Sequence, residues 1–92
     1  MEIREDKLLE EDLLEVLETA IEEEKAAQAR YLGALEIARS PESRVLFQDL
    51  LDVEREHQKL LEERYDQIKK KLEVKIIGKW NRWLKIEAEL AE

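Results

Sequence analysis

The chain has 92 residues, a net charge of −8, and equal shares, 43% each, of hydrophobic and charged residues, with two glycines and one proline. This composition is typical of long amphipathic helices and excludes a β-rich domain or a disordered tail. The negative charge disfavours nucleic acid as a partner, and the absence of cysteine excludes disulfides, thiol nucleophiles, rubredoxin-type iron centres and Fe–S clusters.

The N-terminal 15 residues are acidic and lack the apolar run of a signal peptide. No apolar run elsewhere approaches the roughly 18 residues that a membrane span requires. We therefore expect a cytoplasmic protein without a membrane segment.

A first helix is predicted over about 8–38, because apolar residues recur there at spacings of three and four. They are Leu9, Leu13, Leu17, Ala20, Ile21, Ala27, Tyr31 and Leu35. The helix ends at the segment ARSPES. Ser40 suits the N-cap of a new helix, and Pro41 suits its first position. With so short a connection, the two helices must fold back as an antiparallel hairpin.

A second helix is predicted over about 41–76, and Gly78 favours its end there. A short third helix is predicted over about 79–91, with Trp80 and Trp83 on its apolar side. The expected fold is a single all-α domain, residues 1–92, with a helical hairpin plus a short C-terminal helix. A chain this small buries little core alone, so we expect it to dimerise into a four-helix bundle.

Each long helix carries a glutamate in the middle of its apolar stripe. At about 100° per residue, Leu13, Leu17 and Tyr31 lie within about 20° of Glu24. On the second helix Leu61 and Tyr65 lie equally close to Glu54, and His57, the only histidine, lies about 60° away. An ionised carboxylate in a core costs several kcal/mol unless a partner compensates it.

The two glutamates are also predicted to lie at the same level of the hairpin. Glu24 lies about 22 Å before the turn and Glu54 about 20 Å after it. One hairpin then offers two carboxylates and one imidazole. Two hairpins offer Glu24, Glu54 and His57 twice, which is the ligand set of di-iron centres in four-helix bundles. The charge of the four carboxylates also balances that of two divalent ions. Oxygen and nitrogen ligands suit iron or manganese.

EKAAQARY (Glu24 to Tyr31), followed by EREH (Glu54 to His57), resembles the metal-binding signature of the ferritin-like superfamily. Within it, the rubrerythrin-like proteins and the encapsulated ferritins are the most similar branches. The single half-site in this chain is similar to the encapsulated ferritins, which complete the ferroxidase site between two-helix subunits.

The resemblance implies a ferroxidase that binds two Fe ions per dimer and serves iron storage or detoxification. Glu24, Glu54 and His57 would be the iron ligands, and Tyr31 would be the catalytic tyrosine near the cluster. The implied partners are a second copy of the chain, a ring such as a decamer, and an encapsulin shell whose compartment would enclose the protein.

Two other interpretations remain open. One is peroxide scavenging by a rubrerythrin-like di-iron site with an external electron donor. The other is a metal-free structural or adaptor dimer, in which the stripe glutamates pair with Arg30, Arg55 or Arg64 across the seam. Chance also has to be considered for Glu-x-x-His alone, because about one residue in five is glutamate.

Overall fold

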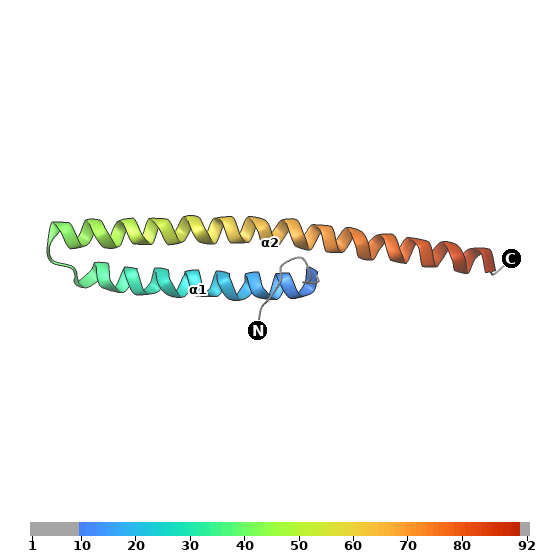
Figure 1. The fold of residues 1–92 in the computed structure, drawn as a ribbon, viewed down its shortest axis with the longest axis horizontal. Coiled ribbons are helices and arrows are strands. Elements are labelled where there is room, and N and C mark those ends of the chain that lie inside the picture. Colours follow the sequence, from blue (N-terminus) through green and yellow to red (C-terminus); the bar gives the residue numbers. More distant parts are fainter. Residues whose placement is uncertain (1–9, 91–92) are drawn as a thin grey trace, which may run out of the picture.

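The computed structural model of the protein describes residues 10–90, and within them it consists of two helices joined by a tight turn (Figure 1). Helix α1 spans Glu10–Ile37 and helix α2 spans Pro41–Leu90. The helices run antiparallel and pack against each other along the whole of α1. The predicted all-α hairpin is confirmed.

The turn is closed by the capping group that the sequence predicts. The backbone N–H of Ser43 donates to Ser40 Oγ at 3.1 Å, which satisfies one of the free donors at the start of α2. On the other side of the turn, Arg44 Nη1 donates to the carbonyl oxygens of Ala38 at 3.3 Å and Leu35 at 3.5 Å. A cation therefore satisfies free carbonyl groups at the C-terminal end of α1.

The prediction of a separate third helix over 79–91 is wrong for the residues described, because α2 continues without interruption through Gly78 to Leu90. A glycine inside a helix costs only about 1 kcal/mol relative to alanine. Nothing at Gly78 requires a bend: its φ is not positive, and a Cβ added there would meet no atom within 4 Å. The flanking residues therefore continue the helix.

The hairpin buries little of its apolar surface. Among residues 10–90, the buried hydrophobic residues are Ile21, Ala27 and Leu51. The structure is 78 Å long but only 14 Å thick, with a radius of gyration of 21.4 Å, whereas a compact domain of this length would have about 12 Å. The dimer expected from the sequence stays a prediction, since the structure contains one chain.

The C-terminal part of α2 extends beyond α1. Lys75 donates a hydrogen bond to Glu10, the first residue of α1, and this contact holds the pKa of the Glu10 carboxyl below its usual value. From Ile76 to Leu90 the helix continues past the level of α1, as Figure 1 shows. We call residues 76–90 the overhang. Neither α1 nor α2 has a stretch long and apolar enough to cross a membrane.

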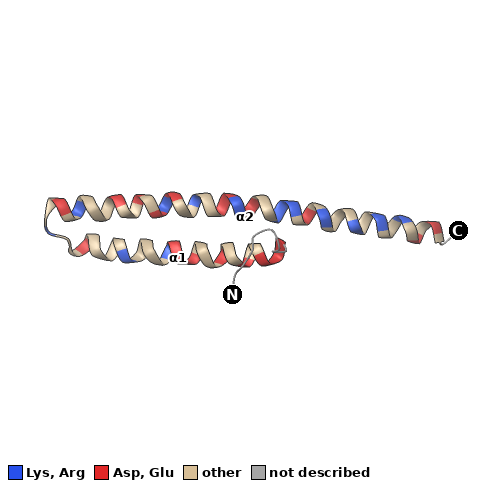
Figure 2. Ribbon diagram, in the orientation of Figure 1, with Lys and Arg blue, Asp and Glu red and all other residues tan. Residues whose placement is uncertain are grey.

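Charge is divided unequally between the two ends of the chain (Figure 2). Helix α1 carries nine acidic and two basic residues. The segment 69–85 of α2 carries seven basic residues and one acidic residue. The chain is therefore acidic along the hairpin and basic towards the C-terminal part of α2.

Candidate metal centre

The structure brings together the three residues predicted as metal ligands. His57 Nδ1 lies 3.7 Å from Glu24 Oε1 and 3.6 Å from Glu54 Oε2. One ligand atom from each residue can be chosen so that all three lie within 4.8 Å of one another. Glu54 and His57 are three residues apart on α2, so they share a face, and Glu24 meets them from α1. The prediction that Glu24 and Glu54 lie side by side, at the same distance from the turn, is confirmed.

The two carboxylates are much less exposed than the imidazole. Side-chain exposure is 21% for Glu24 and 18% for Glu54, against 51% for His57. Glu24 Oε2 is buried and has no hydrogen-bond partner within the described chain. A buried oxygen of this kind costs free energy unless a donor or a cation satisfies it. The donor set and this orphaned oxygen fit a hard divalent metal ion such as Fe²⁺ or Mn²⁺.

The other residues raised by the sequence lie outside this group. Tyr31 is half-buried on α1, seven residues after Glu24, and it is not part of the three-residue cluster; its catalytic role stays a prediction. Arg55 pairs with Asp52 at 3.7 Å, and Arg64 contacts Gln67. Neither arginine is paired with Glu24 or Glu54 within residues 10–90.

Sequence reasoning missed a polar contact beside the centre. Gln28 Nε2 donates to Gln58 Oε1 across the hairpin at 2.6 Å, and Gln58 Nε2 donates to Glu62 Oε1 at 2.9 Å. Gln28 and Gln58 each lie four residues, about one turn, after a stripe glutamate. Helix rise alone does not place them at one level, because Gln28 lies closer to the turn than Glu24 and Gln58 lies further from it than Glu54, so the contact depends on the reach of two long side chains.

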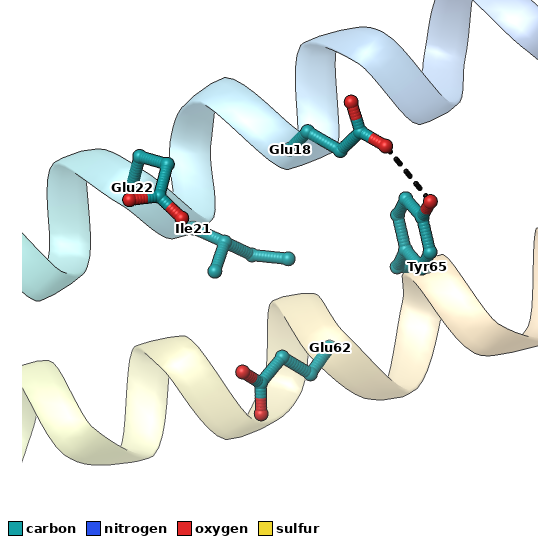
Figure 3. A pocket seen from close by; sticks show the side chains of 5 residues that line it. All are labelled: Glu18, Ile21, Glu22, Glu62 and Tyr65. Atoms are coloured by element: carbon teal, nitrogen blue, oxygen red, sulfur yellow. Dashed lines mark hydrogen bonds between the residues drawn. The ribbon is translucent and has the colours of Figure 1, made fainter.

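A second polar feature lies beside the helix seam, where a groove is lined by Glu18, Ile21, Glu22, Glu62 and Tyr65 (Figure 3). We call it the outer groove. The Tyr65 hydroxyl donates to Glu18 Oε1 at 2.8 Å. This hydrogen bond, with lesser effects of burial and nearby carboxylates, raises the pKa of Tyr65 above its usual value. The apolar spacing predicts Tyr65 as a residue of the stripe, and its hydroxyl finds its partner in Glu18 on the other helix.

A helical hairpin with one central glutamate on the first helix and Glu-x-x-His on the second defines half of the di-metal site of ferritin-like bundles. The family model for rubrerythrin matches residues 15–91, which include all three residues of the centre. The chain therefore belongs to the rubrerythrin family, within the ferritin-like superfamily. No curated protein and no solved structure matches the chain.

Proposed function

We propose that the protein is a di-iron oxidoreductase that binds two Fe ions between two copies of the chain and oxidises Fe(II). The observation that carries this proposal is the buried, unpartnered Oε2 of Glu24, inside a cluster of two carboxylates and one imidazole. Rubrerythrin-family membership supports it independently. A metal ion would satisfy an oxygen that has no hydrogen-bond partner in the described part of the chain.

A second copy is required because one chain supplies too few ligands for two metal ions. Two carboxylates and one imidazole leave most coordination positions of an Fe pair unfilled, and the exposed His57 leaves the cluster open on one side. A symmetric partner doubles the set to four carboxylates and two imidazoles. Its apolar stripe would also cover residues such as Leu17 and Leu61, which are only half-buried in the single chain.

The roles of the chain's own residues follow from this arrangement. Each Fe(II) gives up one electron, and two electrons with two protons reduce O₂ to H₂O₂. Glu24 and Glu54 hold and neutralise the cations, and His57 completes the set with a nitrogen ligand. The flanking stripe residues limit access of water to the site.

Peroxide reduction is a second candidate, favoured by the rubrerythrin match. In that reaction two electrons and two protons convert H₂O₂ into two molecules of water, and an external donor must reduce the iron again. The same three residues would serve. A ferroxidase should react faster with O₂, and a peroxidase should react faster with H₂O₂. Stopped-flow mixing of the Fe(II)-loaded protein with each oxidant distinguishes the two.

The decisive experiment is anaerobic Fe(II) titration followed by oxidation. We expect about one Fe per chain, together with dimerisation, in the parent protein. His57→Ala and Glu54→Gln should each lose tight binding and most of the oxidation rate, by at least the roughly 10- to 100-fold that follows loss of a residue that only supports a ligand. Glu23→Gln and Glu56→Gln are matched controls, because both residues are exposed neighbours on the same helices and lie outside the cluster.

Two outcomes would contradict the proposal. In the first, the parent chain binds no Fe(II) under anaerobic conditions, which favours the metal-free structural dimer. In the second, His57→Ala oxidises Fe(II) as fast as the parent, so that the cluster is not the reactive site. Manganese loading of the same variants tests whether the site prefers iron. The ring assembly and the encapsulin shell that the resemblance implies stay predictions.

A further inference from the structure

The overhang exposes a continuous apolar face that the hairpin does not use. Ile76, Trp80, Trp83 and Leu84 are each about half exposed, and Leu90 is 81% exposed. At about 100° per residue the first four lie within an arc of about 100°. The two indole rings contact each other edge to face with centroids 5.5 Å apart, and together with Lys79 they line a shallow hollow. An apolar face of this extent marks an interaction surface.

Dimerisation at the metal centre would leave the overhang uncovered. Glu54 lies about 20 Å from the turn of its own hairpin. In an antiparallel dimer centred on the metal site, the turn of the partner therefore lies about 20 Å from Glu54 in the opposite direction, near residue 67 of α2. A parallel partner would instead place identical basic residues, Lys75, Lys79 and Arg82, at the same level, where they repel. The antiparallel dimer is favoured, and it carries one free overhang at each end.

The chain itself contains a surface of complementary character. The outer groove has Ile21 between Glu22 on α1 and Glu62 on α2, and Tyr65 lies at the Glu18 end of the groove (Figure 3). The side chains of Glu18 and Glu22 point about 120° and 160° away from that of Glu24, and Glu62 points about 140° away from His57, so the acidic rim of the groove lies away from the exposed side of the metal centre. The overhang presents two indole rings flanked by Lys79 and Arg82. The indoles would pack on the apolar residues of the groove, and the two basic side chains would face its carboxylates.

We propose that the overhang of one copy docks in the outer groove of another copy, with Trp80 and Trp83 against Ile21 and Tyr65 and with Lys79 facing Glu22 or Glu62. The contact joins two different surfaces, so it links metal-site dimers into a ring or a chain of dimers. Neither surface includes a residue of the metal centre, and the inference goes beyond the proposed redox function.

Pairing of two overhangs with each other is the main competing arrangement. Between residues 75 and 90 each overhang region carries four basic and two acidic residues, so self-pairing brings like charges together. Docking on α1, with its excess of seven acidic residues over basic ones, brings opposite charges together. Electrostatic complementarity therefore favours the outer groove.

Disulfide trapping tests the contact directly, because the chain has no cysteine of its own. Lys79→Cys and Glu22→Cys are introduced into separate chains with different tags, and the mixture is oxidised. A disulfide within one chain is excluded, because Lys75 lies at the level of Glu10 and Glu22 is about 18 Å further along α1. Arg39→Cys, at the exposed turn, replaces Glu22→Cys in the control mixture.

We expect the Lys79→Cys and Glu22→Cys chains to form the mixed disulfide in several-fold excess over the control. Preferred self-linkage of Lys79→Cys chains would overturn the proposal in favour of paired overhangs. Equal yields with Glu22→Cys and Arg39→Cys would overturn it as well. A membrane surface is another occupant that a basic, tryptophan-bearing helix face could take. Flotation with phosphatidylglycerol vesicles tests it, and vesicle binding by the overhang without the mixed disulfide also contradicts the proposal.

Variants complete the test in solution. Trp80→Ala with Trp83→Ala should weaken association between dimers by roughly 30-fold or more, the effect of losing an aromatic anchor, while Fe(II) oxidation stays unchanged. Lys79→Glu with Arg82→Glu, and separately Glu22→Lys with Glu62→Lys, should each reduce assembly in sedimentation velocity. One chain carrying all four changes should recover it. Failure of this recovery, with both parental sets folded, would count against the contact.

Discussion

Glu24 shows a conflict between stability and function at the scale of a single residue. Its Oε2 is buried without a hydrogen-bond partner among residues 10–90, while its Oε1 lies 3.7 Å from His57 Nδ1. An unsatisfied buried oxygen destabilises the fold unless something binds it. Residues placed for chemistry commonly reduce stability in this way.

Glu24→Leu should therefore stabilise the metal-free protein, by about 1–3 kcal/mol, because it removes the unsatisfied oxygen and adds apolar contact. The same change should abolish the rise in melting temperature that Fe(II) produces in the parent through binding linkage. Calorimetry with and without anaerobic Fe(II) measures both effects. Glu23→Leu serves as the exposed control, and equal behaviour of the two variants would show that Glu24 holds no special position.

Tyr65 offers a second prediction at this scale, because its hydrogen bond to Glu18 raises its pKa. Folding favours the neutral phenol, so this contribution to stability is complete below the pKa of an unfolded tyrosine and disappears as the pH rises through the folded pKa. Glu18→Gln should lower the Tyr65 pKa towards the ordinary value. Tyrosinate absorbance near 295 nm in a Tyr31→Phe background measures it, and an unchanged titration would contradict the assignment.

Much of the element scale was predictable, because the signals are local. The serine and proline at the turn determine where α2 begins, and the three- and four-residue apolar spacing determines which face of each helix is inward. The side-by-side placement of Glu24 and Glu54 followed from helix rise alone, since both count from the same turn. The N-terminal boundary predicted near residue 8 lies outside the described residues.

The prediction that Gly78 ends a helix was wrong because the local sequence does not decide whether a glycine ends a helix or lies inside one. A glycine that ends a helix adopts positive φ with a capping contact, and nothing in IIGKW distinguishes that from a glycine in mid-helix.

Gln28 and Gln58 were missed for another reason. Their contact depends on side-chain reach across the seam, which the angular position of each residue does not specify.

Gly78→Ala should increase the stability of α2, by about 0.5–1 kcal/mol, because alanine has a higher helix propensity and its Cβ meets no neighbouring atom. Helical circular dichroism at partial denaturation measures the gain. Gly33→Ala, also helical and open, is the matched control in α1 and should give a similar increase. A loss of helicity in Gly78→Ala alone would indicate a bend that α2 requires.

At the scale of the molecule, the hairpin is a thin structure with little buried core. Only three hydrophobic residues are buried among residues 10–90, and the thickness is 14 Å, so the apolar stripes of both helices stay open along one side. Covering those stripes with a second hairpin produces the second layer that a stable helical domain needs. The cluster of Glu24, Glu54 and His57 lies on the same stripes, so a second hairpin that covers them would also supply the further ligands that the proposed function needs.

The folded state should therefore depend on protein concentration. If the hairpin folds stably only as a dimer, each tenfold dilution lowers the stability per dimer by about 1.4 kcal/mol, and the melting temperature falls with it. Calorimetry of the metal-free protein over three decades of concentration measures the shift. Trp80→Ala with Trp83→Ala should show the same dependence, because the overhang lies outside the dimer seam. A melting temperature independent of concentration in both proteins would mean that the single hairpin is stable, and the case for a second chain would then rest on the metal ligands alone.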